Sequence, residues 1–126
     1  MEFQIKTATK GSQQMIVQQK DTAAAYGSGL VEVFATPAML AFMEMTALKS
    51  IEDQLPDDYT TVGSEVHLKH LRASPVGQNL ICNSTMIEVS GRKIVFELQV
   101  WDEDVLVGLG THTRYVVDKQ KFMNKY

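Results

Sequence analysis

The chain has 126 residues, of which 44% are hydrophobic, enough for one ordinary hydrophobic core but not for two domains of typical size. Residues 1–126 are therefore expected to form a single domain. The formal net charge of -3 argues against a nucleic-acid-binding surface, which needs clustered, excess Lys and Arg. The single cysteine, Cys82, allows no internal disulfide, and no stretch has the apolar length of a signal peptide or a membrane span. A cytoplasmic protein without membrane contact is expected.

The first third of the chain predicts only short elements. Two moderately β-prone runs cover residues 2–8 and 13–19. The small residues of 23–30 are typical of an irregular or weakly helical segment.

A long helix is predicted from Thr36 and Pro37 onward. The Thr hydroxyl can cap the helix, and Pro at the first helical position loses no hydrogen bond that it needs. The helix should run to about Leu55, because Pro56 follows. Residues 38–48 are apolar almost all the way round, which indicates a buried helix.

Four β-prone runs follow, at about residues 60–72, 79–89, 92–101 and 105–117. The turns between them are short, so neighbouring strands should be antiparallel. Apolar and polar residues alternate through the third run, as in a sheet with one face on the core. The predicted fold class is α+β, a long central helix wrapped by a five- to six-stranded antiparallel sheet.

Glu44 is the only ionisable residue between Pro37 and Leu48. A carboxylate in so apolar a helix is costly unless it is paired or protonated, although a position at the helix edge would reach water. Perturbed carboxylates are concentrated at active sites, which favours a functional role for Glu44.

Strand alternation places Val66, Leu68 and His70 on one face and His67 on the other. We therefore expect His70 inside and His67 outside. A core histidine satisfied by a backbone carbonyl is the alternative, but the Glu44 carboxylate and a capping hydroxyl are also available to it.

Thr36 and Gly63 carry weaker signals. Most threonines before a helix that starts with proline are simple caps, yet a helix N-terminus also offers N–H groups that suit a developing oxyanion. Gly63 is either an ordinary turn glycine or a point where the backbone approaches a substrate closely.

Other chemistries find less support. The three histidines lack metal-ligand spacing and there is no cysteine cluster, so no metal is expected. Neither a Gly-x-Ser-x-Gly elbow nor a dinucleotide fingerprint is present. Gly108 and Gly110 fit strand glycines under a packed neighbour better than a phosphate loop.

Several residues at fixed spacing resemble the fluoroacetyl-CoA thioesterase family of hot-dog proteins. Glu44 lies eight residues after Thr36, and His70 lies seven after Gly63, in that family's register. The resemblance covers about residues 30–124 and includes Phe34-Ala35-Thr36, Met39, Met43-Glu44, Gly63, His70, the run Gly108–Arg114, and Lys121-Phe122.

The resemblance implies a hot-dog acyl-CoA thioesterase with Thr36, Glu44 and His70 as the catalytic group. His70 would be the base or proton shuttle, Glu44 its partner or a nucleophile, and Thr36 a hydroxyl donor or nucleophile. Gly63 and Arg114 would bind the substrate. The family's site lies at a subunit interface, so a homodimer, or a tetramer of two such dimers, is implied. Coenzyme A is part of the substrate, and no separate cofactor is expected.

Residues 27–30 of this chain, Gly-Ser-Gly-Leu, stand where the family's fluoroacetyl-specific member has aromatic lid residues. A more open entrance and a larger acyl group are therefore expected. Two alternatives remain open: a non-catalytic acyl-CoA-binding protein, and an acyl-thioester hydratase or dehydratase, whose motifs this sequence lacks.

Overall fold

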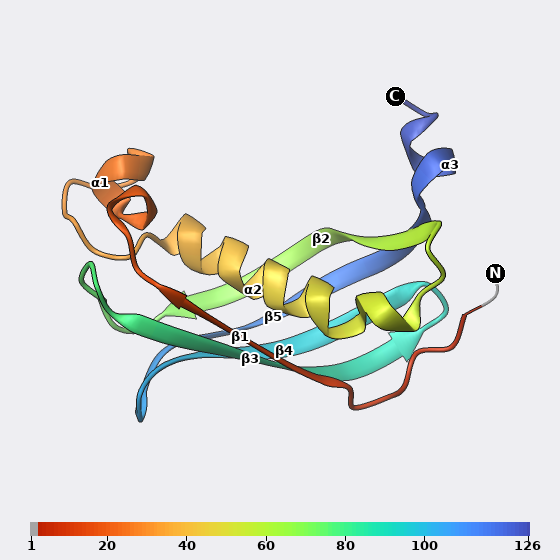
Figure 1. Cartoon of the computed structure of the whole chain (residues 1–126), viewed down its shortest axis with the longest axis horizontal. Helices are drawn as coiled ribbons and strands as arrows, with labels where there is room; N and C mark the ends of the chain where they lie inside the picture. The colour runs from red at the N-terminus through yellow and green to blue at the C-terminus, as the bar shows by residue number, and fades with distance from the viewer. Residues whose placement is uncertain (1–2) are drawn as a thin grey trace.

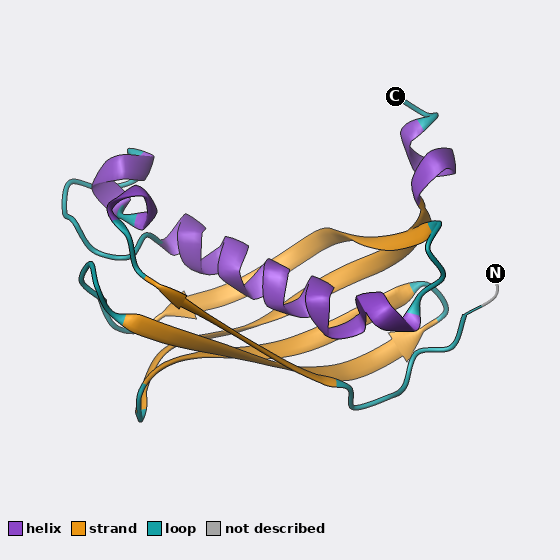
Figure 2. Ribbon diagram, viewed as in Figure 1, coloured by secondary structure: helices purple, strands orange, loops and turns teal. Residues whose placement is uncertain are grey.

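A long helix, α2 (Thr36–Ile51), lies diagonally across the concave face of an antiparallel sheet in the computed structural model, which describes residues 3–126 (Figure 1). The sheet has five strands in the order β1-β3-β4-β5-β2, and the predicted α+β arrangement is confirmed (Figure 2). The strands are β1 (Lys10–Ile16), β2 (Tyr59–His70), β3 (Asn79–Ser90), β4 (Lys93–Asp102) and β5 (Val105–Asp118).

The start of α2 differs from the sequence prediction in one respect. Ala35 occupies the N-cap position, Thr36 is the first helical residue, and no side chain caps the helix. The prediction that the Thr36 hydroxyl caps the helix is therefore wrong, and that hydroxyl is free for another partner. At the other end α2 stops at Ile51, and the 3-10 turn Glu52–Gln54 completes the predicted length.

One face of α2 is not covered by any part of residues 3–126. The helix packs its buried residues on the sheet, and these are Ala38, Met39, Phe42, Met43, Thr46, Ala47 and Ile51. Pro37 and Ala41 are exposed, and Leu40, Glu44 and Leu48 are only half-buried. The prediction of a helix buried all round is thus wrong for a single chain, because one curved sheet covers only one side of a helix.

The N-terminal predictions fit less well. Residues 3–8 form no strand, and Glu2 lies outside the described residues. A single strand, β1, pairs with β3 in place of the two predicted runs. The segment 23–30, predicted to be irregular or weakly helical, begins with the short helix α1 (Ala23–Tyr26), and the turn η1 (Gln19–Asp21) precedes it. The last helix is α3 (Lys119–Met123). No helix in residues 3–126 is long and apolar enough to cross a membrane.

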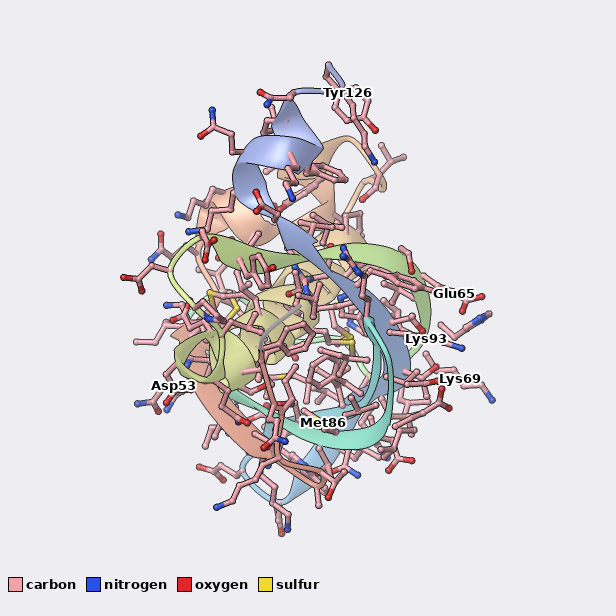
Figure 3. All side chains as sticks on the ribbon, turned by 90° about the vertical axis from the view of Figure 1, so that its right-hand side faces the viewer. Asp53, Glu65, Lys69, Met86, Lys93 and Tyr126 are labelled. Carbon is pink, nitrogen blue, oxygen red and sulfur yellow. The ribbon has the colours of Figure 1, made fainter. Side chains whose placement is uncertain are left out.

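The sheet alternates between a core face and an outer face, as predicted. Ile94, Phe96, Leu98 and Val100 of β4 are fully buried under α2. In Figure 3 the curved sheet encloses packed side chains, and the labelled Glu65 and Lys69 of β2 point outward from it.

Gly108 and Gly110 of β5 lie under close neighbours, as predicted. A Cβ on Gly108 would collide with the Met39 sulfur of α2. A Cβ on Gly110 would collide with the His67 carbonyl oxygen of β2.

Strand β2 lies at an edge of the sheet. Its one neighbour among residues 3–126 is β5, so its second edge faces outward. The register of this pair shifts between Gly63 and Glu65, which marks a β-bulge. The extra residue returns Gly63 to the same face as Val66 and His70, although strict alternation would place it on the opposite face.

Candidate active site

The first residue of α2 meets the last residue of β2. The Thr36 Oγ1 atom lies 2.9 Å from Nδ1 of His70, within hydrogen-bond distance. The buried Phe34 ring makes an edge contact with the imidazole, at 6.2 Å between ring centroids, and limits its orientation. The predicted positions of the two histidines are confirmed, since His70 faces the helix while the His67 side chain is 74% exposed and pairs with Glu65.

Burial shapes the protonation of His70. It lowers the pKa below the ordinary value of 6.5, and the backbone of Arg72 opposes part of that shift. The ring is therefore neutral at neutral pH and can accept the Thr36 hydroxyl proton at Nδ1. The Nε2 atom is buried and has no hydrogen-bond partner within residues 3–126.

A cavity of about 370 Å³ adjoins this pair. Its apolar wall includes Val33, Phe34 and Leu71, and both Thr36 and His70 line it. A small apolar group in this space would therefore lie directly against the hydroxyl–imidazole pair.

Glu44 belongs to a second cluster, further along α2. Its Oε2 atom lies 3.8 Å from Nη1 of Arg114 and 3.9 Å from Nε2 of His112. The side chain of Glu44 is 37% exposed, whereas Arg114 and His112 are buried. The sequence left open whether Glu44 is paired or lies at a helix edge that reaches water. Both are true in part, because the carboxylate is paired and also reaches the surface.

The Arg114 guanidinium is held firmly in place. Its Nε donates to the Thr61 hydroxyl at 2.7 Å, and its Nη2 donates to the Thr61 carbonyl oxygen at 2.8 Å. Its Nη1 lies 3.0 Å from Nε2 of His112. Burial lowers the pKa of Arg114 and the Glu44 carboxylate opposes this, but a guanidinium keeps its charge in proteins. Arg114 is thus a fixed cation facing Glu44.

Gly63 completes the second cluster. A Cβ at this position would lie 2.7 Å from Oε2 of Glu44 and 3.0 Å from Cε1 of His112. The missing side chain makes the room that the Glu44 carboxylate occupies. Gly63 is therefore a point of close approach, as expected, but the group that approaches its backbone is the Glu44 side chain of the same chain.

The five predicted site residues thus form two separate groups within one chain. Thr36 contacts His70, while Glu44 lies with Gly63 and Arg114. Thr36 and Glu44 share one face of α2, but eight residues of helix separate them by about 12 Å.

Sequence reasoning missed two members of the second group, His112 and Thr61. Both are buried polar residues on the core face of their strands. A signal was present, because His112 and Arg114 are two residues apart in one strand and so point the same way.

Comparisons with known proteins point to a thioesterase family. A family model described as fluoroacetyl-CoA-specific thioesterase matches residues 17–120. The fluoroacetyl-CoA thioesterase of Streptantibioticus cattleyicolor is 29% identical over 94 residues, which are 75% of this chain and 68% of that enzyme.

Solved structures show the same fold. A variant of the fluoroacetyl-CoA thioesterase FlK in complex with acetyl-CoA has a TM-score of 0.91 at 23% identity, over 96% of each chain. A thioesterase superfamily member from Thermus thermophilus has a TM-score of 0.88 at 22% identity, over 96% of this chain and 90% of the other. A hot-dog-like protein from Thermanaerovibrio acidaminovorans has a TM-score of 0.86 at 23% identity, over 94% of this chain and 88% of the other, so the predicted hot-dog fold is confirmed. The chain belongs to the fluoroacetyl-CoA-specific thioesterase family.

Proposed function

We propose that this protein is an acyl-CoA thioesterase, which hydrolyses a CoA thioester to a free acid and CoA. The observation that carries the proposal is the 2.9 Å contact between the Thr36 hydroxyl and Nδ1 of His70. A hydroxyl bonded to an imidazole is the pairing that activates a nucleophile for acyl transfer. Membership of a thioesterase family supports the same reaction.

The proposed mechanism has two steps. His70 takes the Thr36 proton while Oγ1 attacks the thioester carbonyl carbon, and the proton then passes to the departing CoA sulfur. Free N–H groups at the start of α2 stabilise the oxyanion, although Pro37 supplies none. Glu44 then takes a proton from a water molecule as the water oxygen attacks the carbonyl carbon of the acyl-Thr36 ester, and this proton passes to the departing Thr36 oxygen, which releases the acid and restores the Thr36 hydroxyl.

The mechanism requires both groups of residues at one site, and a homodimer would supply this. Strand β2 has a free edge, and α2 has an uncovered strip that contains Leu40 and Ala41. A two-fold axis at His67 would pair the β2 strands of two copies antiparallel with core-face residues opposite core-face residues, and the extra residue of the bulge brings Gly63 into this register. In that register Gly63 of one copy lies opposite the partner's His70, so each site combines both groups.

Subunit mixing tests this arrangement. The variants His70→Ala and Glu44→Ala are each expected to be inactive, but random mixed dimers hold one intact site. Activity of about a quarter of the wild-type value should return after unfolding and refolding the mixture. The matched control mixes His70→Ala with Thr36→Ala, which lie in one group and should not complement. Recovery in neither mixture would contradict the shared site.

For the acyl group we propose something larger than fluoroacetyl. Leu30, in the segment without aromatic lid residues, is 99% exposed and covers no other part of residues 3–126. The cavity of about 370 Å³ beside Thr36 and His70 leaves room for an apolar chain. Comparing kcat/KM for fluoroacetyl-, acetyl-, medium-chain and aryl-CoA esters tests this, and a strong preference for fluoroacetyl-CoA would contradict it.

A further inference from the structure

His112 is a fully buried histidine that lies outside the five predicted site residues. Only 1% of its surface is exposed, and both ring nitrogens are within hydrogen-bond distance of a partner. Its Nδ1 lies 2.8 Å from the Glu65 carbonyl oxygen of β2. Its Nε2 lies 3.0 Å from Nη1 of Arg114.

These two partners determine the state of the ring. A carbonyl oxygen only accepts hydrogen bonds, so Nδ1 must carry a proton and donate it to Glu65. A guanidinium only donates, so Nε2 must be unprotonated and accept from Arg114. His112 is therefore a neutral imidazole of a single tautomer.

The charges around the ring favour the same state. The charged groups that face it are Glu44 from α2 and Arg114 from β5. Burial lowers the pKa of His112 below 6.5, the Glu65 backbone opposes this, Arg114 lowers the pKa further and Glu44 raises it. The neutral ring can thus persist below the pH at which a free histidine is protonated.

The bond from Arg114 to His112 fixes one end of the guanidinium. Thr61 holds the Nε and Nη2 side through two bonds, and His112 holds Nη1. That same Nη1 is the atom 3.8 Å from the Glu44 carboxylate. The two bonds to Thr61 still let the planar guanidinium tilt about the line through Nε and Nη2, and the bond from Nη1 to His112 limits that tilt.

We propose that His112 is a positioning residue: its Nε2 aims the Arg114 guanidinium at Glu44 and so sets the place of the carboxylate. The role of Glu44 rests on the proposed thioesterase function, whereas the tautomer of His112 and its bond to Arg114 do not. His112 itself touches no substrate in this account.

Two substitutions separate the two ring contacts. His112→Gln places an amide oxygen near the former Nε2 and keeps an acceptor for Arg114. His112→Asn keeps a donor near the former Nδ1 for the Glu65 carbonyl but leaves Arg114 without its acceptor. Both variants remove the ring and lose similar packing, so they are a matched pair.

The asparagine variant should lose about tenfold or more in kcat with a smaller change in KM, since small misplacements of catalytic groups are costly. The glutamine variant should recover most of that loss. Melting temperatures of the two variants should be similar. Equal losses in both variants, or none in either, would overturn the proposal.

A second readout is independent of turnover. Nitrogen-15 NMR of the wild-type ring should show a protonated Nδ1 and an unprotonated Nε2 that persist below pH 6.5. A protonated Nε2 at neutral pH would overturn the positioning role. Absence of thioester hydrolysis by the wild type, with the expected NMR signals, would refute the proposed function while the bond from His112 to Arg114 stands.

Discussion

The substitution Gly63→Ala tests the second group of residues with one methyl group. The added Cβ would lie 2.7 Å from Oε2 of Glu44, where ordinary van der Waals contact begins at 3.4 Å. The carboxylate must therefore retreat by roughly 0.7 Å, and it can do so because it ends a flexible side chain. The His112 ring, at 3.0 Å, is buried and can move less.

The expected effect is larger on activity than on stability. Overpacking costs about 1–3 kcal/mol in a tight core, and the mobility of Glu44 places this site at the lower end. A displacement approaching 1 Å at a catalytic group costs up to about 10²-fold. We therefore expect kcat to fall by about 10- to 100-fold while the melting temperature drops by only a few degrees.

Thiol release from an acyl-CoA ester measures kcat, and thermal unfolding followed by circular dichroism measures the melting temperature. The control is the double variant with Glu44→Asp, whose shorter side chain relieves the contact. The Gly63→Ala substitution should then cost less in the Glu44→Asp background than in the wild type, which a double-mutant cycle detects. A Gly63→Ala enzyme with wild-type kcat would refute the reasoning.

Further predictions follow from the same contacts. His70→Ala should abolish most turnover with the fold intact, while His67→Ala, on the outer face, should leave kcat unchanged in the same thiol-release assay. The acidic limb of kcat/KM for the free enzyme should lie below pH 6.5, because burial lowers the pKa of His70; a limb above that value would contradict its role as base. The free energy of unfolding in urea should be highest above pH 6.5 and fall as the pH drops below it. The reason is that burial lowers the pKa of His112 in the folded protein, so the unfolded chain binds the proton more strongly than the folded chain does. The substitution His112→Gln should weaken this pH dependence. Burial raises the pKa of Cys82 to about 11, so a thiol reagent should label the native protein slowly and the urea-unfolded protein at once.

The order of helix and strands could be predicted from the sequence because each element carries a strong local pattern. The four strands after residue 56 begin within one residue of their predicted starts. Residues 3–8 of the moderately β-prone run 2–8 form no strand, because β-propensity in a short segment does not decide pairing. Pairing with β3 and packing against α2, both distant in the sequence, determine where β1 lies.

The site could be predicted only in part. Spacing along the chain and family resemblance identified Thr36 and His70, which do meet. The spacing of eight helical residues already places Glu44 away from Thr36, but the strand residues that meet Glu44 depend on the direction in which α2 crosses the sheet. Strict alternation also could not predict the bulge after Gly63, which puts Gly63 on the core face.

The release of free CoA from a panel of acyl-CoA esters is the most direct test of the central claim. Wild-type protein should hydrolyse at least one ester, and both His70→Ala and Glu44→Ala should lose that activity while remaining folded. Tight binding of the same esters to the wild type without CoA release would contradict the account and indicate an acyl-CoA-binding protein.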